Sequence, residues 1–218
     1  MMYRFNPNEL TQEKSLWDIY KKAFLIFPSR LQVITIFIVA LGLGFNAFYF
    51  EEDISVLLSD IRNWSSFGFN YSITTLGFLI AGFTIFATLT KPDMMLAMMD
   101  HPNKKYKLPT LKYNFFVFMK VFVSYIFFSM VYVTIILLGQ KNGFIGNFID
   151  LIPHSIEIKK TIIKIGYIII GCSFIHLLMQ LKSFIFNIYM IVMNMLRWEH
   201  GVAMLKSKNK KNQQKNTI

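Results

Sequence analysis

Hydrophobic residues in this chain are gathered into four long runs and do not alternate with polar ones. The runs cover about Leu31–Phe50, Tyr71–Thr90, Val121–Leu138 and Ile165–Leu181, and none of them contains Asp or Glu. Each approaches the roughly 20 apolar residues that an α-helix needs to cross about 30 Å of hydrocarbon. The pattern therefore predicts an all-α membrane protein with four transmembrane helices.

The polar residues between the runs predict the orientation of these helices. Sixteen Lys and Arg residues precede the first run, lie in the second loop or follow from Arg197 onward, whereas four lie in the first and third loops. Basic residues gather on the cytoplasmic side of membrane proteins, so both termini are expected there (N-in/C-in). This topology accounts for the net charge of +11, and no direct nucleic-acid partner is expected.

The chain divides into three parts. Residues 1–30 mix aromatic and charged side chains, which predicts a cytoplasmic, interfacial amphipathic segment along the inner headgroups. Residues 31–205 form the transmembrane domain, and its third and fourth helices are expected to extend into the cytoplasm. Residues 206–218 are polar and lysine-rich, which predicts a disordered tail that contacts anionic lipid. The apolar residues of 144–152 are too few for a fifth span and predict an interfacial segment outside.

Composition narrows the function classes. The chain is 54% hydrophobic and 17% aromatic, which is too apolar for an ordinary soluble domain, and its one cysteine, Cys172, excludes a disulfide framework. The spans carry no acid for coupled transport, and no nucleophile–base pair or metal-ligand set occurs. We therefore expect a protein that is not an enzyme and uses no metal or cofactor.

The second run carries small residues on one helical face. Gly77, Ala81, Thr84 and Thr88 recur at spacings of four and three, so they share that face. Small residues allow another helix to approach closely, and we expect them to pack helices together, with Gly42 and Gly44 of the first helix as a candidate contact. Lining of an aqueous path is the alternative.

The fourth run carries a polar seam with a seven-residue period. Residues at this spacing include Ser173, Gln180, Asn187 and Asn194, and a second row contains His176 and Ser183. Polar side chains are costly against lipid, so they must face protein or water. Three interpretations remain open: satisfaction inside one bundle by the third helix, a conduit lined by these six residues where several subunits meet, or burial of His176 and Gln180 alone. A lone histidine predicts no metal site, although His176 could titrate as a gate.

The second loop is rich in methionine and lysine. These residues are Met94, Met95, Met98, Met99, Lys104, Lys105 and Lys107. Methionine clusters pack against apolar neighbours or form adaptable docking surfaces, so the loop is either a packing element or the docking site of a cytosolic partner.

The run from Leu76 to Thr88, together with the four-span plan and basic inner loops, resembles small membrane components of bacterial anti-phage defence systems such as those of Hailong or Kiwa. The resemblance implies a tetrameric assembly in the bacterial inner membrane that a cytosolic regulatory protein holds inactive. From the polar seam we expect a homo-oligomeric channel that gives gated ion passage. The alternative is a membrane anchor or sensor that recruits a cytosolic protein and conducts nothing.

Overall fold

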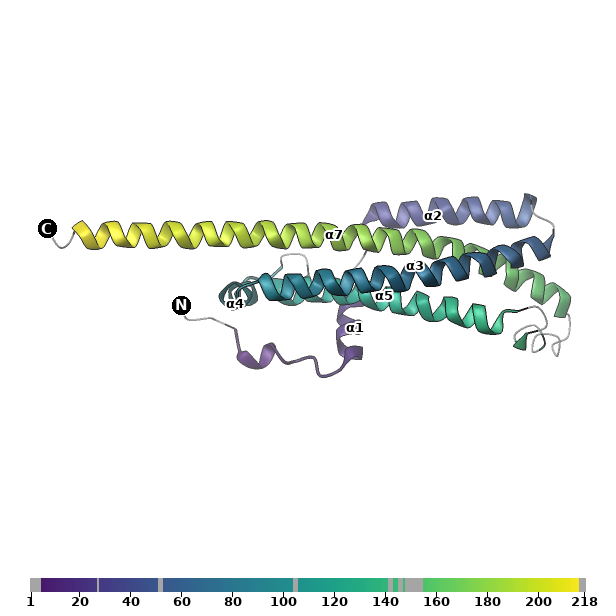
Figure 1. Cartoon of the computed structure of the whole chain (residues 1–218), viewed down its shortest axis with the longest axis horizontal. Helices are drawn as coiled ribbons and strands as arrows, with labels where there is room; N and C mark the ends of the chain where they lie inside the picture. Colours follow the sequence, from purple (N-terminus) through teal and green to yellow (C-terminus); the bar gives the residue numbers. More distant parts are fainter. Residues whose placement is uncertain are drawn as a thin grey trace.

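A computed structural model describes residues 5–26, 28–50, 53–103, 106–140, 143, 144, 147 and 155–215. Every regular element in these residues is helical (Figure 1). The elements are η1 (Pro7–Glu9), α1 (Leu16–Phe24), α2 (Arg30–Phe45), η2 (Asn46–Phe50), α3 (Ile54–Leu89), α4 (Pro92–Asp100), α5 (Thr110–Leu138) and α7 (Ser155–Lys215).

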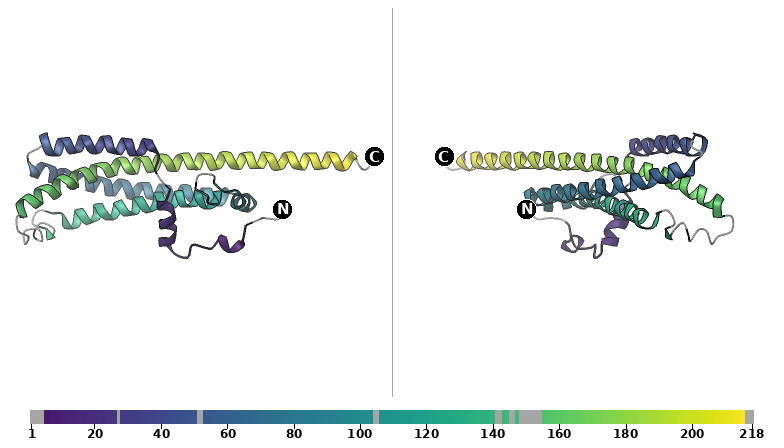
Figure 2. Two further views of the ribbon diagram at one scale, coloured as in Figure 1. Left: turned by 180° about the vertical axis from the view of Figure 1, so that it is seen from behind. Right: turned by 45° about the vertical axis from the view of Figure 1, so that its right-hand side comes forward.

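Four helices are long and apolar enough to cross a membrane, as the sequence predicted, which indicates a multi-pass membrane protein. The candidate spans are Arg30–Phe50, Ile54–Thr88, Thr110–Leu138 and Ile156–Asn209. These helices lie side by side along the long axis, and both ends of the chain lie toward the same end of the bundle (Figures 1 and 2). α3 packs against α5 and α7, while α2 packs against α7.

An aromatic cluster joins three of these helices. The ring of Phe83 in α3 meets the rings of Phe118 and Phe122 in α5 edge-on, each at a centroid distance of 5.7 Å. Phe118 in turn meets Phe184 of α7 at 5.2 Å. Edge-to-face pairs are favourable beyond the area that they bury, so this cluster fixes the height of α3 against α5 and α7.

The contacts of α3 with α7 correct the predicted second span. Ile61 lies 3.6 Å from the position of a Cβ at Gly166, and Phe184 lies 3.6 Å from that of a Cβ at Gly82. The 22 residues from Ile61 to Gly82 rise about 32 Å as an α-helix, which matches the thickness of the hydrocarbon layer. α3 therefore runs beside α7 from Ile61 to Gly82, and the buried Leu57 and Phe86 continue its packing beyond both positions.

The predicted span of 71–90 thus covers only the second half of the candidate span Ile54–Thr88, which begins earlier in the chain. Asn63, Ser65, Ser66 and Asn70 lower the hydropathy of the first half of α3, so this half was assigned to the first loop. A helix inside a bundle tolerates such residues where they face protein, and Ser65 is fully buried.

The two terminal segments differ in how far they follow the sequence predictions. α1 lies in the segment predicted to be amphipathic, runs across the long helices and exposes Trp17 and Phe24 (Figure 1). The tail predicted to be disordered is instead helical, because α7 continues to Lys215 and projects beyond the bundle. Lysine, glutamine and leucine favour helix, and after Gly201 no helix-breaking residue interrupts it. Most of the predicted interfacial segment 144–152 lies outside the described residues.

Candidate functional site

The half of the polar seam nearer the start of α7 lies inside the single-chain bundle. Ser173 is 2% exposed, and its hydroxyl shares a hydrogen bond with the Tyr132 hydroxyl of α5. It also donates to the carbonyl oxygen of Ile170, one turn earlier. The structure therefore favours, at this position, the interpretation in which the third transmembrane helix satisfies the seam.

Gln180 and His176 continue this internal arrangement. Gln180 is 5% exposed, and its Nε2 lies 3.4 Å from Nε2 of His176. The imidazole ring of His176 packs beside Phe128 of α5 at a centroid distance of 5.5 Å. Ser173 and Gln180 thus lie away from the surfaces that a second subunit could contact.

In the half of the seam nearer the end of α7, each residue has different surroundings. Ser183 accepts a hydrogen bond of 3.0 Å from Nε2 of Gln32 in α2, and it donates to the carbonyl oxygen of Met179. Asn187 is half-buried at the edge of a cavity, and Asn194 is exposed. The six predicted pore-lining residues therefore do not form one continuous surface. The sequence gives their shared helical face, but only the neighbouring helices decide what covers it.

The small-residue face of α3 does not pack against another helix of the same chain, which corrects the expectation of packing within one bundle. Gly77, Ala81, Thr84 and Thr88 are exposed, and a Cβ at Gly77 would meet nothing within 4 Å. The two threonine hydroxyls donate to carbonyl oxygens of their own helix, to Ile80 and Thr84 respectively.

The first helix is not the partner of this face. Gly44 of α2 lies against Ile168 of α7, and Asn46 donates a 3.0 Å hydrogen bond to the hydroxyl of Tyr167. A Cβ at Gly42 would meet nothing within 4 Å. The small residues of the first transmembrane helix therefore serve α7 or face outward.

The exposed face extends through the part of α3 that was assigned to a loop. Spacings of four and three residues continue upstream from Gly77, and every member is exposed. We name this set the α3 stripe: Asn63, Phe67, Asn70, Thr74, Gly77, Ala81, Thr84 and Thr88. In the described residues, the side-chain amides of Asn63 and Asn70 have no hydrogen-bond partner. The spacing of these residues can be read from the sequence, but the predicted second span begins at Tyr71. Asn63, Phe67 and Asn70 therefore fall outside that span.

The methionine cluster is mostly a packing element. Met94 and Met99 are each 3% exposed, whereas Met95 and Met98 are half-buried. Of the four methionines, only Met95 and Met98 therefore reach the surface, and the docking of a cytosolic partner stays a prediction.

Of the three predicted docking lysines, Lys107 is exposed and has a positive φ of 54°, in the tight loop between α4 and α5. Lys104 and Lys105 lie outside the described residues.

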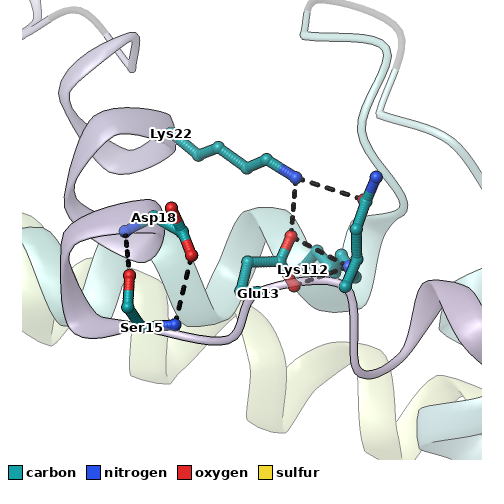
Figure 3. A network of polar contacts seen from close by, with 6 residues as sticks. Glu13, Ser15, Asp18, Lys22 and Lys112 are labelled. Carbon is teal, nitrogen blue, oxygen red and sulfur yellow. Dashed lines mark hydrogen bonds and ion pairs between the residues drawn. The ribbon is translucent and has the colours of Figure 1, made fainter.

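An ion cluster that the sequence did not predict ties the N-terminal segment to α5 (Figure 3). The carboxylate of Glu13 accepts hydrogen bonds from Lys112 at 2.7 Å and from Lys22 at 2.7 Å. The Glu13 and Lys112 side chains are 9% and 10% exposed. Burial raises the pKa of the Glu13 carboxyl, but the hydrogen bonds from Lys112 and Lys22 lower it more, so the net pKa lies below its ordinary value.

The start of α1 is fixed locally beside this cluster. The backbone N–H of Asp18 donates to the Ser15 hydroxyl, and the Ser15 N–H donates to the Asp18 carboxylate, each at 3.2 Å. This reciprocal capping box satisfies two N–H groups at the helix start. The Ser15 contacts hold the pKa of the Asp18 carboxyl below its ordinary value.

The part of the chain that the structure describes contains no group of three His, Cys, Asp or Glu residues close enough to hold a metal ion. Comparison with protein-family models, with curated proteins and with solved structures found no match to this chain. The function must therefore be argued from the membrane helices themselves, and foremost from the α3 stripe.

Proposed function

We propose that this chain forms a homo-oligomer in the membrane, with the α3 stripe facing the centre of the assembly, and that polar solutes or ions pass along that centre. The observation that carries the proposal is the α3 stripe, whose small and polar members no part of the same chain covers. Phe67, its one large apolar member, packs beside Phe174 of α7. It keeps the expected activity of ion passage but assigns the lining to α3 instead of the fourth transmembrane helix.

Exposure of the polar members of the α3 stripe to lipid costs free energy. Asn70 and Thr74 lie within the candidate span Ile54–Thr88. A primary amide without a hydrogen-bond partner costs several kcal/mol in hydrocarbon. A monomer would pay this cost, whereas an assembly that covers the stripe would not.

The α3 stripe also has the form of a seam between packed helices. Gly77 and Ala81 allow close approach of a neighbouring helix, and the heptad spacing keeps one seam directed at that neighbour over several turns. Cyclic assemblies bring the same face of every subunit to the axis, so the amides and hydroxyls would meet there. Polar groups of several subunits around one axis provide the hydrogen bonds that water or an ion needs in a narrow passage.

Single-channel recording in a planar bilayer tests the proposal. Discrete conductance steps are expected from the purified protein, and a double variant, Asn70→Leu with Thr74→Val, should reduce the unitary conductance at least tenfold. Phe37→Leu is the matched control, because Phe37 is 61% exposed on α2, outside the α3 stripe. Equal conductance of the double variant and the control would contradict the assignment.

Disulfide trapping tests the assembly separately. In a Cys172→Ser background, Thr74→Cys should form a disulfide-linked dimer on oxidation, whereas Phe37→Cys, at an exposed position of α2, should not. A chain that stays monomeric by native mass spectrometry and gives no trapped dimer would refute the homo-oligomer.

A second candidate function, a membrane anchor for a cytosolic protein, is favoured by a different observation. α7 continues past the start of α2, and one side of it is exposed for about three turns. Large apolar residues on it are 40–61% exposed: Ile185, Phe186, Tyr189, Val192, Met193 and Leu196. The lysines that follow from Lys206 would repel one another in a parallel pair of arms, which favours an acidic helical partner over a second copy.

Co-purification with a conservative control tests this second function. Val192→Glu with Leu196→Glu should release the partner, and Val192→Leu with Leu196→Met should keep it, with conductance the same in both. Loss of conductance together with loss of the partner would mean that partner binding and ion passage depend on each other.

The resemblance to anti-phage defence components stays a prediction.

A further inference from the structure

A cavity of about 370 Å³ lies where the corner between α1 and α2 meets α5 and α7. Its polar lining includes Ser29 and Ser183 together with Asn187. The aromatic rings of Tyr113 and Phe186 supply apolar wall. Three residues that the sequence placed along a pore, Gln180, Ser183 and Asn187, thus border this cavity.

The charge in the cavity is positive. Lys120 and Lys182 both line it, and the lining contains no Asp or Glu. Among the described residues, neither lysine takes part in an ion pair. The ammonium of Lys120 donates to the carbonyl oxygen of Ile26, but an ammonium has three donors, so further donors can reach an acceptor in the cavity.

The depth of the cavity coincides with one end of the membrane-spanning bundle. α2 begins at Arg30, and Gln32 in its first turn donates a hydrogen bond to Ser183 of α7. α1 crosses the bundle beside this point and exposes Trp17 to the surroundings (Figure 1). Tryptophan on an amphipathic helix prefers the headgroup layer, so the cavity opens at the level of lipid headgroups.

From this arrangement we propose that the cavity between α1, α2, α5 and α7 binds the phosphate group of an anionic phospholipid, with Lys120 and Lys182 as the cationic ligands. Hydroxyl and amide groups of Ser29 and Asn187 serve the remaining headgroup oxygens. Tyr113 and Phe186 contact the glycerol and the first methylene groups. Basic pockets between transmembrane helices are suited to this chemistry because two lysines without a carboxylate partner gain an anion at little desolvation cost. The inference does not depend on ion passage or on a protein partner.

Native mass spectrometry of the full chain in detergent tests the proposal, with phosphatidylglycerol, phosphatidylcholine and inorganic phosphate as the probes. Phosphatidylglycerol should bind at least tenfold more tightly than phosphatidylcholine. Lys182→Gln should weaken phosphatidylglycerol binding about fivefold, as expected for the loss of one lysine near the membrane surface, and Lys120→Met at least as much. Lys14→Gln is the control, because Lys14 is an exposed lysine outside the cavity and its change removes the same charge.

The outcomes test whether the cavity binds an anionic lipid and distinguish a lipid phosphate from free phosphate. If millimolar inorganic phosphate displaces the lipid, the site recognises the phosphate ion itself, and if it does not, the lipid is the ligand. Equal binding of phosphatidylglycerol and phosphatidylcholine would overturn the proposal. So would a Lys182→Gln variant that binds phosphatidylglycerol as tightly as the Lys14→Gln control, since Lys182 is exposed and its change leaves the fold intact.

Discussion

The carboxylate of Glu13 binds two lysines, the buried Lys112 and the partly exposed Lys22. Glu13→Gln removes the charge and leaves the ammonium of Lys112 buried without a counter-ion, which should destabilise the docking of the N-terminal segment by about 1–3 kcal/mol. Hydrogen exchange of the α1 amides should rise accordingly. Glu9→Gln, a change at an exposed acid outside the cluster, should leave exchange unchanged, and equal exchange in both variants would contradict the prediction.

The same carboxyl makes the docking depend on pH. The pKa of Glu13 in the folded chain lies below its ordinary value of 4.5, because the lysine hydrogen bonds outweigh the effect of burial. A depressed pKa means that the stabilisation is complete above pH 4.5 and is lost as the pH falls through the lower, folded pKa. α1 exchange should therefore be constant from neutral pH down to about 5 and accelerate below 4.5, after correction for the intrinsic rate. Glu13→Gln should abolish this step.

Gly68 of α3 packs tightly against aromatic rings of α5 and α7. A Cβ there would lie 2.7 Å from ring atoms of Tyr132 and 3.1 Å from Phe174. Gly68→Ala should therefore lower the free energy of unfolding by about 1–3 kcal/mol through overpacking, read as a lower Tm in detergent. Gly42→Ala, where the added methyl meets nothing within 4 Å, should leave Tm unchanged or raise it.

Among the helical elements, α1 places its aromatic face outside the bundle. Trp17 stacks on Tyr20 at 5.4 Å and remains 61% exposed. In a variant that keeps Trp17 and replaces Trp64 and Trp198 by Phe, lipids brominated near the headgroup should quench the fluorescence more strongly than lipids brominated at the chain ends. Stronger quenching by an aqueous quencher than by either lipid would instead place α1 in water.

The next prediction concerns the orientation of the whole molecule across the membrane. Both chain ends lie toward the same end of the bundle (Figure 2), and the excess of basic residues predicts that this end faces the cytoplasm. In a Cys172→Ser background, Lys14→Cys should be protected from an impermeant thiol reagent in intact cells, and Glu157→Cys should be labelled. The opposite labelling pattern would reverse the topology.

The candidate site was predicted only in part, for reasons that particular residues make clear. The polar residues of the fourth run were found by their period, yet Ser173 and Gln180 are buried because α5 and α2 cover that face. The α3 stripe was found only from Gly77 onward, since Asn63 and Asn70 lower the local hydropathy. Averaged hydropathy assigns polar residues of a long helix to a loop, whether they face protein, water or lipid.

The sequence by itself determined the membrane class, the all-helical character and the approximate places of four spans, because the transfer of apolar residues into hydrocarbon depends on length and composition alone. The tertiary structure decided the height of α3 against its neighbours, the ion cluster at Glu13, the burial of Met94 and the cavity at Lys120. These features arise between segments far apart in the chain. Helical period defines which residues share a face, but only packing determines which face is covered and which is left for lipid or another subunit.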